Sequence, residues 1–351
     1  MSLLQDTVGN IKPLDTNAMQ KVKERLDNLT KPVGSLGALE DMAVRLAGIQ
    51  RSVNLDVGSK AVVVCAADHG VAEEGVSAFP PEVTGQMVIN FLNGGAAINV
   101  LSRAVGASVV VADVGVNGIP VNHPDLINMR VKNGTDNFTR GPAMSRAEAV
   151  AALEAGIKLA QQQVQRGTKV LATGEMGIGN TTASSAVLAA ISGLSPDQVT
   201  GRGTGVSDRS LAVKRDVIAR GLAVNNPDPE DGIDVLAKVG GLEIGALAGL
   251  ILGGAAFGVP VVVDGFISGA AALVAYKIAP RCKDYMFGSH LSEEPGHRVM
   301  VEMLELKPVL RMGMRLGEGT GAVLVFPLLD AAVKVLKEMA TFEELAAQTL
   351  K

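Results

Sequence analysis

Short apolar segments rich in β-branched residues alternate with helical patterns along the middle of the chain. The apolar segments are 61–66, 108–114, 169–173, 259–263 and 285–287. Each ends in a turn that contains glycine or a polar residue, and apolar residues between them recur at helical spacing. Strands that are apolar throughout and separated by helices are typical of a parallel sheet covered on both faces. The pattern therefore predicts an α/β fold with a Rossmann-like parallel sheet flanked by helices.

Helical spacing also marks both ends of the chain. Apolar residues three and four apart define one helix face within 16–50, and the same spacing returns at 323–339. We expect the two ends to pack together as a small helical domain made of residues 1–55 and 309–351. Residues 56–308 would then form the α/β nucleotide-binding domain.

The most apolar stretch, 239–263, does not have the pattern of a membrane span. Glu243 interrupts it, glycines punctuate it and Pro260 breaks it, whereas a span needs about 20 uninterrupted apolar residues. A buried helix over 242–252 that leads into the strand at 259–263 explains the same letters, so we expect no membrane partner.

Composition and charge exclude several classes of function. The 351 residues carry a formal net charge of −4, with eight Phe, two Tyr and no Trp. A nucleic-acid binder is expected to carry a basic stripe and stacking aromatic residues, and both are missing here. Cys65 and Cys282 lie far apart without metal-ligand spacing, so we expect two reduced, buried thiols and no structural metal. The first residues lack a secretion-signal pattern, which favours a cytoplasmic protein.

Three glycine-rich turns are candidates for phosphate binding. The first, 174–182 (GEMGIGNTT), follows the strand at 169–173 and precedes a predicted helix over 183–191. Glycine allows close backbone approach, and a helix N-terminus favours an anion. The second turn, 201–205, is followed by Lys214, and the third is 317–321. A single turn could be a tight connection without a ligand, and Lys214 could be a solvated surface charge, but three such turns together predict a phosphorylated small ligand.

Several acids lie where catalysis would need them. Glu318 stands between glycines within apolar sequence, where burial would raise its pKa and make it a general base; an exposed turn residue is the alternative. Glu175 has a similar setting and could assist it. Asp68 and His69 end the first strand and could touch substrate or only satisfy strand-end backbone groups.

Two further positions bear on a phosphate or ribose. Ser292 could bind either group, or it could cap a helix that begins near Pro295. Asp264 follows the strand at 259–263 as a single acid rather than an acidic pair, so magnesium–diphosphate chemistry is not indicated and we expect no cofactor or metal.

Six long segments, in order along nearly the whole chain, resemble the nicotinate-nucleotide–dimethylbenzimidazole phosphoribosyltransferase family. They are LTKPVGSLGALE (29–40), AADHGVAEEGVSAFPPEVT (66–84), GEMGIGNTT (174–182), KVGGLEIGALAG (238–249), VVVDGFISGAAAL (261–273) and MRLGEGTGA (314–322). The resemblance implies transfer of the phosphoribosyl group of nicotinate mononucleotide to a benzimidazole, releasing nicotinate and forming α-ribazole 5′-phosphate for cobalamin. It also implies a Rossmann-like domain with a small helical domain, in a homodimer.

The resemblance assigns roles to individual residues. Glu318 matches the catalytic base, Glu175 an acid beside the base pocket and Asp264 an acid on the substrate side. The phosphate site carries over to Gly177, Asn180, Thr181, Gly203, Gly205, Lys214 and Ser292. Phe79, Gln86 and Met87 are expected to line the pocket for the aromatic base, where Phe79 would stack on a flat ring.

Alternatives stay open at this point. The acceptor could be dimethylbenzimidazole, another benzimidazole, adenine or a phenol. A dehydrogenase would need GxGxxG between a strand and a helix, and only 317–322 comes close, in the looser GxGxxA form. A non-catalytic nucleotide-sensing module would explain the phosphate turns, but it has no need for Glu318; a Glu318 that points to solvent would favour it.

Overall fold

The computed structural model describes residues 2–118, 122–203 and 207–349. Its six-stranded sheet has the order β3-β2-β1-β4-β5-β6, and every neighbouring pair is parallel. The strands are β1 (Lys60–Ala67), β2 (Ser108–Gly115), β3 (Leu126–Asn128), β4 (Val170–Met176), β5 (Val261–Val263) and β6 (Met286–Gly288). The predicted parallel α/β fold and its five strands are confirmed. The short β3 lies in an irregular stretch whose sequence does not predict it.

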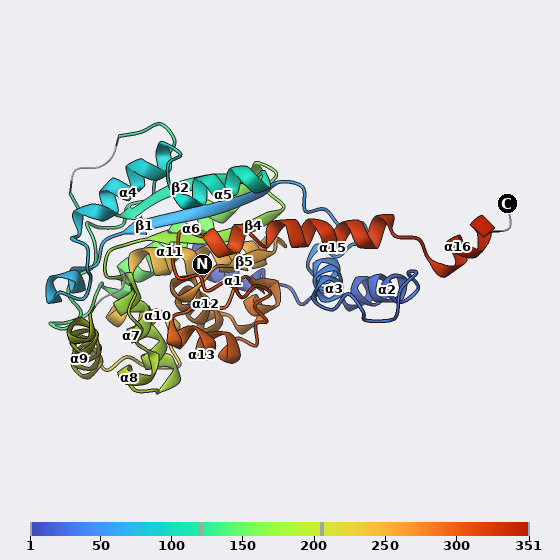
Figure 1. The fold of residues 1–351 in the computed structure, drawn as a ribbon. Coiled ribbons are helices and arrows are strands. Elements are labelled where there is room, and N and C mark those ends of the chain that lie inside the picture. The colour runs from blue at the N-terminus through green and yellow to red at the C-terminus, as the bar shows by residue number, and fades with distance from the viewer. Residues whose placement is uncertain (1, 119–121, 204–206, 350–351) are drawn as a thin grey trace.

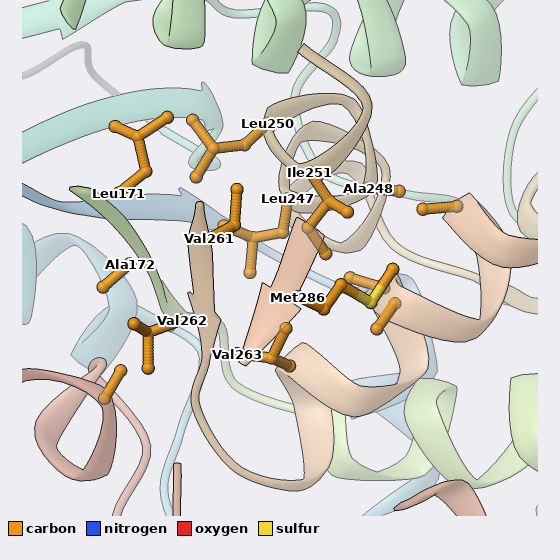
Figure 2. Close-up of a cluster of buried hydrophobic side chains, with 14 of the residues drawn as sticks. Leu171, Ala172, Leu247, Ala248, Leu250, Ile251, Val261, Val262, Val263 and Met286 are labelled. Atoms are coloured by element: carbon orange, nitrogen blue, oxygen red, sulfur yellow. The ribbon is translucent and has the colours of Figure 1, made fainter. Parts of the chain in front are cut away.

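Helices cover both faces of the sheet. One face packs against α11 (Leu242–Ala256), which contacts β1, β2, β4 and β5. Figure 2 shows Leu171 and Val261 on the α11 side and Ala172 and Val262 on the opposite side. This second face contacts α4 (Glu82–Leu92), α5 (Ala97–Val105) and α14 (Thr320–Val323). The alternation explains why strands covered on both faces are apolar at every position.

The predicted buried helix at 242–252 is confirmed as α11. It packs closely on α6 (Arg146–Gln165), whose start is capped by Ser145 and Glu148 in a capping box, as their spacing predicts. Glycines make this close approach possible: a Cβ at Gly156 would overlap the Ala246 carbonyl oxygen. Within the described residues, no helix combines the length and apolar character required to cross a bilayer.

The two chain ends meet beside the sheet. Figure 1 shows α15 (Phe326–Glu338) beside α3 (Ala38–Gln50) and α2 (Thr16–Asp27). The Thr30 amide donates to the Ala340 carbonyl at 3.0 Å, and Arg25 Nε donates to the Leu336 carbonyl at 2.8 Å.

Other parts of the end segments pack on the α/β layers. The sequence does not predict α1 (Leu3–Gly9), which contacts α6 and α11, and α14 contacts β4 and β5. The predicted helix at 323–339 is divided between α14 and α15. The division into domains 1–55, 56–308 and 309–351 stays a prediction.

The remaining helices complete the layers or extend from them. They are α7 (Asn180–Ser192), α8 (Pro196–Val199), α9 (Asp208–Asn225), α10 (Gly232–Val239), α12 (Phe266–Ile278), α13 (Pro295–Met303), α16 (Phe342–Thr349) and the 3-10 helices η1 (Gly70–Glu74) and η2 (Pro280–Tyr285). The chain leaves β1 toward β2 on one side and later returns as β4 on the other. In such sheets, ligands bind outside the carboxyl ends of the strands next to this reversal.

Candidate active site

A cavity of about 500 Å³ opens at the carboxyl ends of β4 and β5. It collects most of the predicted site residues from segments far apart in the sequence. The predicted residues that line it are Phe79, Glu175, Gly177, Asn180, Thr181, Gly203, Asp264, Ser292 and Glu318. Gly205 lies outside the described residues.

Glu318 occupies a turn in which three consecutive residues have left-handed backbone. Its φ is 62°, between Gly317 at 89° and Gly319 at 92°. The Glu318 carbonyl packs against Gly174 of β4 so closely that a Cβ on Gly174 would overlap it. A non-glycine residue with positive φ is uncommon, and such strain concentrates at functional sites. The strained backbone of this turn therefore directs the Glu318 side chain into the cavity.

Glu318 is 7% exposed, and its carboxylate Oε2 accepts from the Ile98 amide at 3.1 Å. Ile98 lies in the first turn of α5, where backbone amides have no partner within the helix. Burial raises the pKa of Glu318, and the Ile98 hydrogen bond offsets part of that rise. The expected buried acid is confirmed, and a raised pKa makes its carboxylate a stronger base.

Asp264 holds the same turn from the end of β5. Its Oδ1 accepts from the Ala322 amide at 2.9 Å and its Oδ2 from the Gly319 amide at 3.3 Å. Burial raises the pKa of Asp264 to about 7, although these backbone amides favour the charged form. The geometry gives Asp264 a structural task in addition to any contact with substrate: it fixes the turn that carries Glu318.

Glu175, near the end of β4, is the third acid of this cluster. Its Oε1 accepts from the Glu318 amide at 3.4 Å, and its Oε2 contacts the Asn180 side-chain amide. Burial, followed by the nearby Glu243 and Asp264 carboxylates, raises the pKa of Glu175 to about 8. At neutral pH Glu175 is therefore largely protonated, which limits the negative charge around Glu318.

The first glycine turn leads directly into α7. Gly179, with φ of 98°, precedes the helix, so Asn180 and Thr181 form its first turn. The Ile178 amide donates to Thr84 Oγ1 at 3.1 Å. This fixes the turn against α4 and leaves the start of α7 facing the cavity.

Lys214 is buried behind this turn rather than solvated on the surface. It is 1% exposed, and its Nζ donates to Thr181 Oγ1 at 3.0 Å and to the Gly201 carbonyl at 3.2 Å. Burial lowers the pKa of Lys214 to about 8, against the opposing effect of the Glu294 carboxylate. Lys214 does not line the cavity itself; it lies one layer behind Thr181 and Gly203.

The opposite wall of the cavity is apolar. Val83 and Met87 line it from α4, Phe79 lines it from the loop before that helix, and Leu316 lines it from the loop before Glu318. Phe79 is 53% exposed at the mouth. Gln86 is exposed on α4 and is absent from the described lining residues. Phe79 and Met87 thus line the cavity, whereas Gln86 does not; their contact with an aromatic base stays a prediction.

Ser292 lines the cavity without capping the next helix. The N-cap of α13 is Glu294, and Ser292 Oγ accepts from the Glu294 amide at 3.4 Å. The capping alternative for Ser292 is therefore wrong.

Asp68 and His69 lie outside this cavity. His69 Nε2 contacts Glu243 Oε1 at 2.7 Å in a fully buried pair. Burial lowers the pKa of His69, but Glu243 more than offsets this, so the pKa is raised. A Cβ on Gly179 would lie 3.2 Å from His69 Cβ, so the ring supports the first glycine turn from behind. Asp68 and His69 line a separate, open hollow of about 740 Å³.

Comparisons with known proteins agree with this geometry. A family model described as "Phosphoribosyltransferase" matches residues 11–346. A nicotinate-nucleotide–dimethylbenzimidazole phosphoribosyltransferase of Desulforamulus reducens is 60% identical over 345 residues, 98% of each chain, and one of Chloroflexus aggregans is 57% identical over 344 residues, also 98% of each. This chain belongs to the nicotinate-nucleotide–dimethylbenzimidazole phosphoribosyltransferase family.

A solved structure supports the same assignment. The crystal structure of CobT from Thermus thermophilus superposes with a TM-score of 0.91 at 50% sequence identity, covering 94% of this chain and 98% of that one. The resemblance inferred from the six sequence segments is confirmed over nearly the full length of the chain, and with it the parallel α/β fold of a phosphoribosyltransferase.

Within this phosphoribosyltransferase fold, the cavity contains residues that the sequence analysis missed. They include Val83, His290, Glu294, Arg315 and Leu316. Arg315 immediately follows Met314 in the family-like segment MRLGEGTGA, and its Nη1 donates to the Gly203 carbonyl at 3.3 Å. That segment was a usable signal for Arg315 and Leu316, whereas His290 and Glu294 carry no comparable local pattern.

Proposed function

We propose that this enzyme transfers the 5-phosphoribosyl group of nicotinate mononucleotide to 5,6-dimethylbenzimidazole or a related base. The products would be nicotinate and α-ribazole 5′-phosphate, an intermediate for the lower nucleotide loop of cobalamin. The observation that carries the proposal is the position of Glu318. Its buried carboxylate lies in one cavity with an apolar wall that suits a flat ring and a glycine turn at a helix N-terminus that suits a phosphate.

The phosphate is assigned to the side of the cavity formed by the start of α7. Gly177, Asn180 and Thr181 line this side, and Gly203 and Ser292 stand beside it. A helix N-terminus favours an anion through its free amides and its dipole. Arg315 lines the same side and Lys214 lies behind Thr181, so two cations offset the phosphate charge.

The acceptor base is assigned to the apolar wall of Phe79, Val83, Met87 and Leu316. An unprotonated ring nitrogen would attack C1′ of the ribose while the bond from C1′ to the pyridinium nitrogen breaks. The electron pair of that bond goes to the departing nitrogen, which becomes the neutral ring nitrogen of nicotinate. The proton on the other azole nitrogen goes to the Glu318 carboxylate, and attack from the opposite face converts the β-riboside into an α-riboside.

The residues of the chain contribute mainly by positioning. A cationic leaving group departs as a neutral ring, so little acid catalysis is required, while holding the two substrates in line gives a large rate gain. Glu318 adds general-base catalysis, which typically contributes about 10²–10⁴ in rate. The Ile98 hydrogen bond to Oε2 orients the carboxylate and leaves Oε1 to receive the proton.

The sensing alternative is less well supported. A sensor that only binds a nucleotide requires no buried carboxylate beside an apolar wall, and Glu318 faces the cavity rather than solvent. A sensor would also have no need for the rare left-handed φ of Glu318.

We further propose that the enzyme works as a homodimer in the cytoplasm. Support comes from the exposed apolar residues Phe79 and Leu316 at the cavity mouth, 53% and 59% exposed, and from α16, which projects from the body in Figure 1. Sedimentation velocity of the purified protein tests the dimer: a monomer at micromolar concentration contradicts it. Fractionation of the source cells tests the location.

The direct test is incubation of the purified protein with nicotinate mononucleotide and 5,6-dimethylbenzimidazole, followed by mass spectrometry. We expect equal amounts of free nicotinate and α-ribazole 5′-phosphate. Parallel incubations with adenine and with phenol identify the acceptor class. Tight nucleotide binding without product from any acceptor would contradict the proposal and support the sensor.

A further inference from the structure

An acid of the chain itself occupies part of the expected phosphate site. Glu294, at the start of α13, reaches the second glycine turn, where its Oε1 accepts from the Gly203 amide at 2.9 Å. The residue is 6% exposed and lines the cavity. Its Oε2 is buried and has no hydrogen-bond partner among the described residues.

An unpartnered carboxylate oxygen is costly inside a protein, because a charged group removed from water needs compensating hydrogen bonds. The turn nevertheless makes room for it: a Cβ on Gly201 would overlap Glu294 Oε2. Glycine at 201 thus allows a carboxylate to lie directly against the backbone. The arrangement is a built anion site, filled by an internal anion that is only half satisfied.

The same groups would serve the substrate phosphate. Gly203 lines the cavity beside Thr181, and a Cβ on Gly203 would lie 3.1 Å from Lys214 Nζ. The Lys214 ammonium bonds neutral oxygens of Thr181 and Gly201, while Glu294 acts on it at longer range and raises its pKa against the effect of burial. A phosphate dianion that enters this site therefore meets donors already engaged and a carboxylate of the same sign.

We propose that Glu294 is an internal competitor for the phosphate of nicotinate mononucleotide. Without substrate, its carboxylate holds the Gly203 amide and balances the buried Lys214 charge. On binding, the phosphate displaces it from Gly203 and takes over both groups. This inference rests on the proposed function, because it assigns the phosphate to that side of the cavity.

Competition has a consequence for specificity. Every phosphorylated ligand must spend part of its binding free energy to displace Glu294, whereas a ligand without phosphate leaves Glu294 in place. Because this cost is the same for both ligands, Glu294 lowers the affinities for free phosphate and for the nucleotide by the same factor. Only the nucleotide has ring and ribose contacts that keep its binding tight despite this cost.

The test is Glu294→Gln, which keeps the shape and a carbonyl oxygen for Gly203 but removes the charge. Isothermal titration calorimetry would measure the binding of inorganic phosphate, nicotinate mononucleotide and nicotinate riboside. Removing one nearby like charge is expected to tighten the two phosphate ligands about three- to tenfold. The affinity for the riboside, which has no phosphate, stays unchanged.

Glu293→Gln is the matched control, because it removes the same charge from the neighbouring, exposed position. It should leave all three affinities unchanged. Glu294→Asp is a second test variant: it keeps the charge but shortens the reach to Gly203, so it should also tighten phosphate binding. Circular dichroism of each variant verifies the fold, and either folded Glu294 variant suffices for the test.

The inference is overturned if the folded variants bind phosphate with unchanged or lower affinity, or if riboside affinity shifts equally. Glu294 would then be a permanent brace of the turn. Turnover by the wild type is measured separately, so the two proposals can fail independently. Tighter phosphate binding by the Glu294 variants without turnover by the wild type would support Glu294 as a competitor and reject the proposed reaction. Turnover by the wild type without tighter phosphate binding by the variants would support the reaction and reject the competitor.

Discussion

On the acid side of the cavity, backbone amides of residues 318–322 bind carboxylates of the chain itself, Glu175 and Asp264. On the side proposed for the phosphate (below, the phosphate side), the buried ammonium of Lys214 bonds only neutral oxygens in the hydrogen bonds described for it, and one internal acid, Glu294, occupies the Gly203 amide. Both sides combine a glycine turn with buried charge. Their polar groups are satisfied in different ways.

This difference distinguishes the part of the cavity that is preorganised from the part that a ligand is expected to rearrange. On the acid side, the amides are already engaged by fixed carboxylates, so the backbone around Glu318 has its final geometry before substrate arrives. On the phosphate side, a cation and a half-satisfied anion are left to be rearranged by a ligand. At the 317–321 turn, the Glu318, Gly319 and Ala322 amides are already occupied by acids of the chain, so the other two glycine turns are the better candidates for a phosphate.

The largest effect is expected from Glu318→Gln. The amide keeps the shape of the side chain but cannot accept the azole proton, so kcat should fall about 10²- to 10⁴-fold. Affinity for nicotinate mononucleotide should change little, since the phosphate side is intact. Steady-state kinetics and calorimetry measure the two quantities.

Glu305→Gln is the control for this variant. Glu305 is also a glutamate with positive φ, at 53°, but it is exposed and pairs with Lys283. Its variant should keep wild-type kcat. A Glu318→Gln enzyme that retained a tenth of the wild-type kcat would rule out Glu318 as the base.

Lys214→Met should act on binding instead. It removes the buried cation, and a hydrogen bond to a charged group is worth about 1.5–3 kcal/mol, so affinity for nicotinate mononucleotide should fall about 10- to 100-fold. Affinity for nicotinate riboside should stay the same. Arg215→Met, which removes the neighbouring cation of α9 that pairs with Asp197, is the control; an equal loss for riboside would show that Lys214 acts on the fold rather than on phosphate.

Asp264→Asn tests how far the acid side is preorganised. Asparagine has one acceptor oxygen, so either the Gly319 or the Ala322 amide loses its partner. An unsatisfied buried group costs about 1–3 kcal/mol, and we expect the free energy of unfolding to fall by that amount. Loosening the Glu318 turn should lower kcat about tenfold with unchanged nucleotide affinity, which chemical denaturation and kinetics measure. A loss of affinity with unchanged kcat would instead place Asp264 in contact with substrate.

A pH dependence of stability follows from the two raised pKa values of the acid side. Burial raises the pKa of Glu175 to about 8 and of Asp264 to about 7, above the values of about 4 expected in the unfolded chain. Between pH 4 and 8 the folded protein therefore binds more protons than the unfolded one. The stabilising contribution of these groups is full below about pH 4 and is lost as pH rises through 7 and 8.

Thermal unfolding followed from pH 5 to pH 9 measures this loss as a falling Tm. Glu175→Gln removes one of the two groups and should flatten the decline. An identical slope in wild type and variant would show that Glu175 titrates normally.

Much of the fold could be predicted from the sequence, since its signals are local. Runs such as AVVVCA and SVVVADV predicted β1 and β2, and Ser145 with Glu148 predicted the start of α6. The three-residue β3 and the seven-residue α1 were missed. Helix α1 contains too few positions for a periodic pattern. Strand β3 lacks the fully buried apolar run that marks the equally short β5 and β6.

The same distinction between local sequence signals and tertiary packing applies to the candidate site. Glu318, flanked by glycines in apolar sequence, was identifiable as a buried acid. Lys214 on α9 was not identifiable as buried, because one lysine in a helix has the same local sequence whether it faces solvent or Thr181. Gln86 and Met87 are neighbours on α4, and only the rotation of that helix against the sheet decided that Met87 faces the cavity.

By itself, the sequence determined most strands, several helices, the positions of the glycine turns and the family. These depend on periodicity and on the backbone freedom of glycine, which are properties of neighbouring residues. Only the tertiary structure decided which amides of each glycine turn meet an acid of the chain and which acid that is. The contacts that decide this join Glu318 to Glu175 and to Ile98, 143 and 220 residues apart, and Glu294 to Gly203, 91 apart. Burial of these groups makes each hydrogen bond obligatory, and folding alone brings such distant partners together.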